Sequence, residues 1–307
     1  MSLPYSVWEG IFMRQRFSRF LSYVTIIVLL PYIVTVFLNG PAAVSSSNVD
    51  ETQVRVRTDA GEASMSLSEY AIGVLAKEIP ASYEKEALKA QAILVRTDIY
   101  SKLESGGKDA VLEESFWNQE QMQEAWGAGK YHANLARLEE VWEKTEGQVV
   151  TYEGKLAKAP FFRLSNGSTR DGKEVLGSDE YPYLKIVSCP LDIESKEQMK
   201  TITVDDMDAE VAACDTAGYV LQVKVGEEAV SGEEFRSNYH LESSCFSLQH
   251  YNGKLRITTR GIGHGLGMSQ YTANELAKEG KTVEDILQYF FEGTEIKEVA
   301  EIVKTDP

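Results

Sequence analysis

The segment GIGHGLGMSQY, at 261–271, constrains the fold of this chain more than any other stretch. Its four glycines occupy every second position: Gly261, Gly263, Gly265 and Gly267. Glycine loses more backbone entropy on ordering than any other residue. Such a pattern is therefore favoured only where the backbone bends sharply or approaches another group closely.

Two interpretations of this segment stay open from its residues alone. In the first, the alternating glycines form a surface without side chains, against which a long ligand lies. Polar and aromatic residues beside that surface would then contact the ligand: His264, Ser269, Gln270 and Tyr271. In the second, the glycine backbone packs tightly inside the protein, and His264 is a hydrogen-bonded histidine of the core.

Nucleotide and nucleic-acid binding are poorly supported. The segment does not match the G-x-G-x-x-G pattern, because Leu266 and Met268 interrupt it, and it lacks the Lys-Ser/Thr pair of a phosphate loop. The chain of 307 residues carries a formal net charge of -16, whereas nucleic acids require a basic surface. We expect no nucleic-acid partner and no cofactor.

An uncharged segment near the N-terminus divides the chain. Residues 20–38 run for 19 positions without a charge, and as a helix they would reach roughly 28 Å, about the hydrocarbon thickness of a bilayer. Three arginines precede this segment, and no Lys or Arg follows it before Arg55. The positive-inside rule then predicts a cytoplasmic segment at 1–19, a transmembrane anchor at 20–39 and an extracytoplasmic remainder.

A cleaved signal peptide is the alternative to this anchor. Its apolar core would be shorter, at about 7–15 residues, and the sequence at 41–45 matches a cleavage site only weakly. The length of the span favours an uncleaved anchor. Residues 40–50 are small and polar and are expected to form a linker, which leaves 51–307 as the extracytoplasmic domain.

The pattern of apolar residues predicts an α+β domain that mixes helices with antiparallel strands. One helix is expected to begin at Ser66, which has capping-box spacing to Glu69, and to end before Pro80. Further helices are expected at Ser82–Ser105, within 110–144, and last at Val283–Phe291. Strands are expected at Gln53–Arg57, within 146–155 before a Glu-Gly turn, and at Tyr219–Val225, Cys245–His250 and Leu255–Thr259.

Glu78 is the most informative single residue. It lies at helical spacing from Ala71, Val74 and Leu75, so its carboxylate shares the apolar stripe of the first helix. A carboxylate in apolar surroundings has a raised pKa, which a general acid near neutral pH requires. The plain alternative is that Glu78, in the last turn of the helix, turns into solvent.

The next helix carries a basic face that bears on this choice. Lys85, Lys89 and Arg96 lie near one another on it. On an ordinary protein this would be a solvated stripe. If the helix folds back after Pro80, Lys89 or Arg96 could approach Glu78 and lower its pKa, or could contact a polar substrate.

Three cysteines give no support to a metal site. Cys189, Cys214 and Cys245 are an odd number, so at least one stays unpaired, and none has C-x-x-C spacing. We expect buried small residues with at most one disulfide, and no metal.

Several ordered blocks resemble one known family. GIGHGLGMSQYTA resembles a signature of the stage II sporulation protein D/LytB domain family, and YAIGVLAKEIP with EALKAQAILVRT resembles its other characteristic block. FFRLSNGSTRDG, YPYLKIVSCPLD and FRSNYHLESSCF follow in the order of that family. The resemblance covers roughly residues 50–300.

The resemblance implies a membrane-anchored lytic transglycosylase that acts on bacterial peptidoglycan during engulfment of the forespore. Such enzymes cleave the MurNAc–GlcNAc bond without water and leave a 1,6-anhydro-MurNAc end. They favour glycan strands whose stem peptides a partner amidase has removed, and other engulfment proteins are expected partners. By motif, the catalytic acid/base is Glu78, and the other activity-linked positions are Lys89, Arg96, Tyr183, Lys185 and Asp192.

This chain departs from the family pattern at three points. Arg163-Leu164-Ser165-Asn166-Gly167 stands where a His-Ser-Thr-Ser-Gly-Gly-like run is common, so substrate contacts there differ. Some clostridial relatives bind zinc through Cys and His residues after the second helix, and EESFWNQEQMQEAWG contains neither. Ile79 replaces a common Met, a small change in volume.

Other functions remain as alternatives. The first is a non-enzymatic peptidoglycan-binding module or amidase enhancer of the LytB type, for which Glu78 would be dispensable. The second is a structural scaffold of an engulfment complex. A metal hydrolase lacks spaced ligands.

Overall fold

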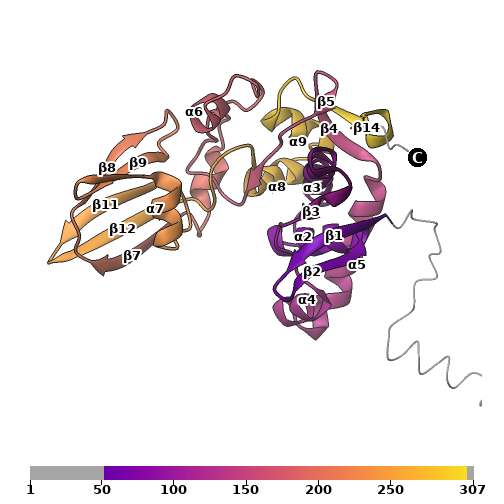
Figure 1. Ribbon diagram of the computed structural model, residues 1–307, viewed down its shortest axis with the longest axis horizontal. Helices are drawn as coiled ribbons and strands as arrows, with labels where there is room; N and C mark the ends of the chain where they lie inside the picture. The colour runs from indigo at the N-terminus through magenta and orange to yellow at the C-terminus, as the bar shows by residue number, and fades with distance from the viewer. Residues whose placement is uncertain (1–51, 303–307) are drawn as a thin grey trace, which may run out of the picture. The chain divides into compact units, whose positions relative to one another are not determined.

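The computed structural model describes residues 52–302. The chain divides into a unit at 1–50 and a unit at 51–307, and the second is described here by itself. The predicted cytoplasmic segment, anchor and linker lie outside the described residues. Within 52–302, no helix is both long and apolar enough to cross a membrane. The predicted mixture of helices and antiparallel strands is confirmed for this part of the chain (Figure 1).

Helix α2, Leu67–Glu78, begins and ends where its sequence signals predict. The side chain of Ser66 accepts a hydrogen bond from the N–H of Glu69, which satisfies one of the donors left free at a helix start. Ile79 is extended, as a residue before proline prefers, and the helix stops there. Both ends of the helix that carries Glu78 are therefore set by local chemistry.

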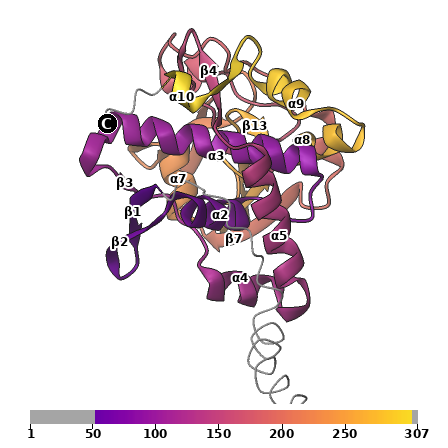
Figure 2. The same ribbon diagram turned by 90° about the vertical axis from the view of Figure 1, so that its right-hand side faces the viewer.

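Helix α3, Lys85–Gly106, is buried on two faces, of which only one was predicted. The predicted stripe packs into a first hydrophobic cluster: Leu88, Ala92, Val95 and Ile99. A second face packs into another cluster: Ala87, Ala90, Ile93 and Leu94. A helix that is apolar nearly all round lies inside a protein, and Figure 2 shows α3 crossing the group of helices.

The first cluster joins α2 and α3 to two further helices, α4 and α5, and to a small sheet. Strand β1 pairs with β2 antiparallel and with β3 parallel. Gly127, at φ 69°, separates the two helices that form within the predicted helical stretch. The elements are β1 Gln53–Thr58, β2 Gly61–Ser66, β3 Val111–Leu112, α4 Gln119–Trp126 and α5 Ala128–Lys144, with the short 3-10 helix η1 at Gly107–Asp109.

The second cluster lies between α3 and the C-terminal elements. Helices α8 and α9 both contact α3, and so does strand β4. Strand β4 also pairs antiparallel with β5 and β14. The elements are β4 Gln148–Tyr152, β5 Lys155–Leu156, α8 Gln270–Lys278, α9 Val283–Phe290, β14 Glu295–Glu298 and α10 Val299–Ile302.

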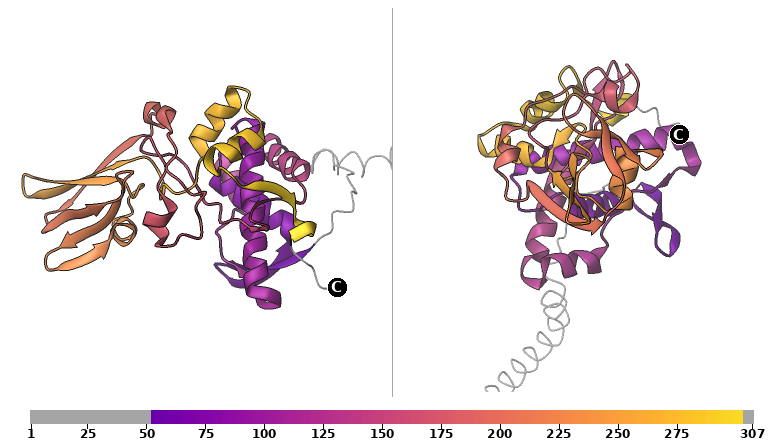
Figure 3. Two further views of the ribbon diagram at one scale, coloured as in Figure 1. Left: turned by 90° about the horizontal axis from the view of Figure 1, so that it is seen from above. Right: turned by 90° about the vertical axis from the view of Figure 1, so that its left-hand side faces the viewer.

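The third cluster belongs to a strand-rich region. Two antiparallel three-stranded sheets, in the orders β10-β9-β8 and β11-β12-β7, pack around Phe235 of α7. These strands lie together in Figures 1 and 3, in red and orange. The elements are β7 Met199–Asp205, β8 Ala209–Cys214, β9 Val220–Val225, β10 Glu228–Ser231, α7 Gly232–Asn238, β11 Phe246–Tyr251 and β12 Lys254–Arg260.

The glycine segment connects the strand-rich region to α8. Strand β13, Met268–Ser269, pairs parallel with β6, Phe161–Phe162, and Ile262 forms a bridge with Leu164. Two short helices lie between β6 and β7 in the chain: α6 Gly172–Leu176 and the 3-10 helix η2 Pro190–Glu194.

Three expectations about the elements need correction. Helix α9 ends at Phe290 and is not the last helix, because β14 and α10 follow it. The predicted strands correspond to β1, β4, β9, β11 and β12, and the remaining strands were not predicted. Strand β7 was missed because its burial is slight: most of Met199–Asp205 is exposed, so no strong alternation marks it.

The cap of α2 allows a direct test. Ser66→Ala removes the acceptor for the N–H of Glu69, and we expect the free energy of unfolding to fall by about 1 kcal/mol in urea denaturation. Ser64→Ala is the control, because Ser64 is exposed and bonds only the side chain of Gln53. Equal losses from the two variants would contradict the capping role.

Candidate active site

Glu78 is the last residue of α2, and its side chain is exposed. Of the two alternatives for Glu78, the structure shows the one in which the residue turns toward solvent: Ala71, Val74 and Leu75 are buried, whereas Glu78 at the end of the helix is exposed. Among residues 52–302 it has no hydrogen-bond or ion-pair partner. The carboxyl is therefore free to meet another molecule.

The pKa of Glu78 is nevertheless raised, as predicted. The largest cause is desolvation by the protein atoms around it, and the neighbouring charge of Lys77 opposes this by lowering the pKa. The position of Glu78 at the C-terminus of α2 raises its pKa further. Free carbonyl groups at a helix C-terminus carry partial negative charge, and they disfavour an adjacent carboxylate.

The turn that follows Glu78 is held from two sides. The guanidinium of Arg137, on α5, donates to the carbonyls of Ala81 and Tyr83 at 2.9 and 2.7 Å. The N–H of Glu84 donates to the side chain of Asn274, on α8, at 2.8 Å. The direction in which α2 ends is thus fixed by tertiary contacts, and Pro80 supplies only the stop.

Tyr83, in this turn, lies near a group of polar side chains from other parts of the chain. Burial raises its pKa to about 12, and the charges of Arg163 and Glu197 and the phenol of Tyr271 lie within electrostatic range. Arg163, the residue that departs from the family pattern, forms an ion pair with Glu197 at 2.9 Å. The N–H of Tyr271 donates to the carbonyl of Arg163. Four distant segments therefore meet a few residues beyond Glu78.

Lys89 and Arg96 do not approach Glu78, and the prediction that they could is wrong. The Lys89 ammonium binds Glu86, one turn earlier on the same helix, at 2.6 Å. Arg96 is buried, and its guanidinium donates to the carbonyls of Thr145 and Trp142 at the end of α5. Burial lowers the pKa of Arg96 to about 10, which still leaves it charged at neutral pH. Arg96 acts as a structural link between α3 and α5.

Asp192 is fully buried and holds three segments together. Its carboxylate accepts hydrogen bonds from the N–H of Ser165 at 2.7 Å and from the hydroxyls of Ser269 and Thr272 at 2.7 and 2.6 Å. A buried carboxylate is tolerated when its lone pairs are used in this way. Asp192 therefore positions η2, the segment after β6 and the start of α8.

Two other predicted residues lie near Asp192 in the chain but in different settings. Tyr183 is buried, and its hydroxyl accepts a hydrogen bond from the N–H of Lys158. Lys185 is exposed and forms an ion pair with Glu292 at 3.0 Å. Of these two, Lys185 has access to a ligand.

The glycine segment packs inside the protein, and the prediction that it forms a bare ligand surface is wrong. All four glycines have positive φ, between 74° and 111°. A Cβ on Gly267 would lie 2.0 Å from the carbonyl oxygen of Pro160, and one on Gly265 would lie 2.4 Å from the ring of Tyr219. Side chains are excluded here by other parts of the same chain.

His264 is part of this packing. Its Nδ1 accepts a hydrogen bond from the N–H of Leu266 at 3.1 Å, which places the proton of the neutral ring on Nε2. A hydrogen bond joins the ring to the backbone of Phe161. Burial lowers the pKa of His264 to about 4, so the ring is neutral at physiological pH. It stabilises the loop and is unsuited to general acid chemistry.

The remaining residues of the segment divide into buried and half-exposed. Ser269 is buried and caps α8. Gln270 is buried, and its amide donates to Gln91 of α3 at 3.1 Å. Tyr271 is half-exposed beside Arg163, so among the four residues predicted from this segment it has the best access to a ligand.

A buried charge cluster was missed by the sequence analysis. Arg170 forms ion pairs with Asp215 at 2.5 Å and Glu233 at 3.0 Å, and also donates to the carbonyl of His264. It ties the loop after β6 to the strand-rich region and the glycine segment. The only available signal was the run Ser-Thr-Arg-Asp-Gly, which gives no hint of partners 45 and 63 positions away.

The cysteines are all unpaired, and Cys189 and Cys245 are buried while Cys214 is exposed. In the described part of the chain, no group of three or more His, Cys, Asp or Glu side chains could hold a metal ion. The expectation of no metal stays a prediction.

Comparisons with known proteins identify a matching family model and several relatives. Residues 61–152, which include all of α2 and α3, match the family model described as Stage II sporulation protein. Stage II sporulation protein D of Bacillus subtilis (strain 168) is 33% identical over 257 residues, which cover 76% of this chain and 74% of that protein. The protein of the same name in Bacillus amyloliquefaciens matches to the same extent.

A relative of lower sequence identity is named as an amidase enhancer and not as a sporulation protein. The amidase enhancer of Bacillus subtilis (strain 168) is 23% identical over 292 residues, which cover 72% of this chain but only 39% of that protein.

The packing of the glycine segment can be separated from its backbone strain. Gly267→Ala and Gly154→Ala both put a side chain at similar positive φ, 81° and 76°, but a Cβ at Gly154 meets nothing within 4 Å. We expect a loss of about 1 kcal/mol in the free energy of unfolding for Gly154→Ala. Gly267→Ala should lose at least about 2 kcal/mol more, because Pro160 or the segment must move. Equal losses in chemical denaturation would argue against close packing.

The structural role of Arg96 gives a second test. Arg96→Met removes the charged donor that the carbonyls of Thr145 and Trp142 share, although each carbonyl keeps one other donor. We expect the free energy of unfolding to fall by about 3 kcal/mol. Lys89→Met removes only a partly exposed pair and should cost less than about 1 kcal/mol. A fully stable Arg96→Met protein that binds substrate poorly would show that Arg96 contacts the substrate instead.

Proposed function

We propose that this chain, which belongs to the stage II sporulation protein D family, is a lytic transglycosylase of peptidoglycan with Glu78 as its general acid and base. The observation that carries the proposal is one unpaired, accessible carboxyl with a raised pKa, set at a rigidly held helix end. General acids near neutral pH need such a shift.

One carboxyl is sufficient for the proposed reaction. Glu78 donates its proton to the bridging oxygen between MurNAc and GlcNAc as that C–O bond breaks. The C6 hydroxyl of the same MurNAc then attacks C1, and Glu78 accepts the hydroxyl proton. The products are a 1,6-anhydro-MurNAc end and a free GlcNAc hydroxyl. No water enters, so the second carboxylate that ordinary glycoside hydrolysis uses is not needed.

The neighbouring side chains suit a sugar polymer. Tyr83, Tyr271 and the Arg163–Glu197 pair offer hydroxyl, aromatic and charged groups next to the turn that follows Glu78. Arg96, Asp192, Ser269, Gln270 and His264 support the site through buried hydrogen bonds and do not contact the glycan. Arg163 would supply a contact that differs from the usual one in the family.

The cellular setting is part of the proposal. The substrate is peptidoglycan whose stem peptides have been removed, and the process is engulfment during sporulation. Residues 20–39 anchor the protein in the cell membrane, with 1–19 in the cytoplasm and the domain at 51–307 outside. An amidase that removes stem peptides and other engulfment proteins are the partners.

The similarity to an amidase enhancer favours one second candidate, a peptidoglycan-binding module that assists an amidase without cleaving glycan. The exposed position of Glu78 is compatible with this candidate as well. The two functions differ in whether anhydro ends appear when the chain acts alone.

The pH dependence of cleavage tests the role of Glu78. With peptide-stripped glycan and the full-length chain, we expect kcat/KM to fall as pH rises above the raised pKa of Glu78, because the acid must be protonated. Lys77→Met removes the charge that lowers this pKa, so the falling limb should move to higher pH. Products are measured as anhydro-muramyl ends by mass spectrometry.

Glu78→Gln should lower the rate by about a hundredfold or more. The same change should increase the free energy of unfolding at neutral pH. A carboxyl whose pKa is raised in the folded state destabilises the protein once it is ionised, and glutamine carries no charge. Glu69→Gln, at an exposed position on the same helix, is the control: it should leave the rate unchanged, and it should not raise stability, because Glu69 lies in the first turn of α2, where a negative charge is favoured. Full activity of Glu78→Gln would exclude Glu78 as the acid, and no anhydro product from the original chain would favour the binding module.

A further inference from the structure

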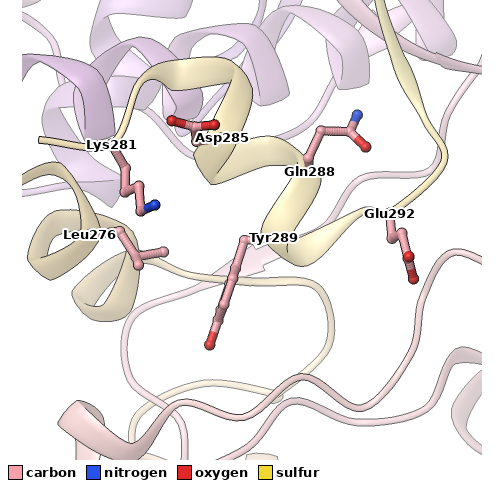
Figure 4. Close-up of a pocket in the computed structure, with 6 residues that line it drawn as sticks. All are labelled: Leu276, Lys281, Asp285, Gln288, Tyr289 and Glu292. Atoms are coloured by element: carbon pink, nitrogen blue, oxygen red, sulfur yellow. The ribbon is translucent and has the colours of Figure 1, made fainter. Parts of the chain in front are cut away.

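Two pockets lie outside the residues that the proposed reaction uses, and their linings differ. Figure 4 shows the first, between α8 and α9, where Lys281 lies with Asp285 and Glu292. Its charges are of both signs, so it favours neither anions nor cations. The second pocket has mostly apolar walls and charges of one sign only.

This second pocket, called here the α2–α5 pocket, lies between α2, α4 and α5. These helices lie together in Figure 2, and α5 contacts both of the others. The volume is about 430 Å³, within the range of small-ligand sites. Two buried residues of the lining are Met122 and Tyr131. The other apolar residues of the lining are half-buried: Met65, Ile72, Phe116, Trp117 and Leu135.

The half-buried residues form one apolar surface over the first hydrophobic cluster. They come from β2, α2, the segment before α4, and α5, and all of them pack against that cluster from outside. Single exposed apolar residues are common on proteins and need no explanation. Several that meet around one hollow indicate a surface that another molecule covers, because water in contact with them is unfavourable.

The walls of the α2–α5 pocket are held in place before any ligand arrives. The N–H of Trp117 donates to the carbonyl of Gly73, in the middle of α2, at 3.0 Å. A Cβ at Gly73 would lie 2.7 Å from the carbonyl oxygen of Trp117, so this approach requires glycine. The ring of Phe116 packs edge-on against Tyr70 at 5.3 Å between centroids. A pocket with fixed walls loses little conformational entropy on binding.

The charges at this pocket are all negative. Among residues 52–302, the charged members of the lining are Glu69 and Glu139, and neither has an ion-pair partner there. Lys144 binds Glu140 instead. Desolvation raises the pKa of Glu139, and the charge of Glu143, one turn later on α5, raises it further. A positive charge on a ligand would offset both effects, and aromatic rings in the wall also attract cations.

These features together select one class of occupant. The two carboxylates repel anionic lipid surfaces, and a second copy of this chain is itself acidic, with a net charge of -16. A glycan offers no large aliphatic groups to match Met65, Ile72 and Leu135. A peptide segment with large apolar side chains next to Lys or Arg matches both the walls and the charges.

We propose that the α2–α5 pocket binds a partner protein through a segment in which large apolar side chains stand next to Lys or Arg. The apolar side chains enter the pocket and contact Met122 and Tyr131, while the basic groups lie beside Glu69 and Glu139. The partner therefore rests on α2, the helix that ends at Glu78. This inference goes beyond the proposed function and does not depend on glycan cleavage.

Binding of defined peptides tests the inference. The full-length chain in phosphatidylcholine nanodiscs is titrated with three fluorescent peptides of equal length, and empty nanodiscs are the blank. The first peptide combines Leu and Trp with Lys and Arg. The second has Glu in place of Lys and Arg, and the third has Ser in place of Leu and Trp. Only the first should bind saturably, as measured by fluorescence anisotropy.

Two substitutions locate the binding. Leu135→Ser should weaken binding of the first peptide by about tenfold. Glu139→Lys should weaken it by about fivefold or more. Because Glu139 is exposed and Glu143 repels it, this second substitution should leave folding intact.

Each substitution has a matched control elsewhere in the chain. Ile186→Ser removes another exposed apolar side chain, and Glu227→Lys makes the same change in net charge at an exposed position between β9 and β10. Both controls should bind the first peptide as the parent does.

Several outcomes would overturn the inference. It is wrong if the first peptide does not bind, or if the three peptides bind alike. It is also wrong if Glu227→Lys weakens binding as much as Glu139→Lys, since net charge would then explain the attraction. If the chain forms dimers that Leu135→Ser separates, the occupant is a second copy and not a basic partner. None of these measurements involves glycan, so their failure leaves the proposed function untouched.

Discussion

The buried carboxylate of Asp192 is the interaction on which the middle of this molecule depends. Its three short hydrogen bonds come from a backbone N–H of the segment after β6 and from two hydroxyls at the start of α8. Water cannot replace these donors in a fully buried position, so loss of the carboxylate would leave all of them unsatisfied. Because α8 in turn holds the turn after Glu78 through Asn274, the candidate acid depends on Asp192 without touching it.

Glu78 shows how a raised carboxyl pKa can arise without full burial of the side chain. The carboxyl is accessible, yet protein atoms on one side and the carbonyl end of α2 both disfavour its charged form. An acid buried among Ala71, Val74 and Leu75 would have a higher pKa but could not reach a polymer. The end of a helix reconciles access with desolvation.

The sequence predicted those features that are encoded locally. Ser66 and Pro80 determine both ends of α2, and Gly107 ends α3, because caps and stops act within a few residues. It also singled out Glu78 correctly as a carboxyl with a raised pKa. It left the direction of the side chain open, because periodicity describes a complete helix and Glu78 stands at the last position.

Features that depend on distant partners could not be predicted. The second buried face of α3 has the ordinary small and aliphatic residues of any helix, and only α8 and α9 turn it into core. The glycine segment allowed two interpretations, and the choice between them depends on two distant contacts. Pro160 lies 107 positions before Gly267, and Tyr219 lies 46 positions before Gly265. Arg96 and Lys89 looked equivalent on one helix face, yet one is enclosed by α5 and the other is not.

The ion pairs of Arg170 have a consequence for the evolution of the strand-rich region. A guanidinium that is only 3% accessible and joined to Asp215 and Glu233 forms a charge lock between two parts of the chain. If that region were exchanged for a foreign module, the arginine would remain enclosed without counter-ions, at a cost of several kcal/mol. Recombination across this boundary therefore yields a stable protein only when Arg170 is inherited together with Asp215 and Glu233.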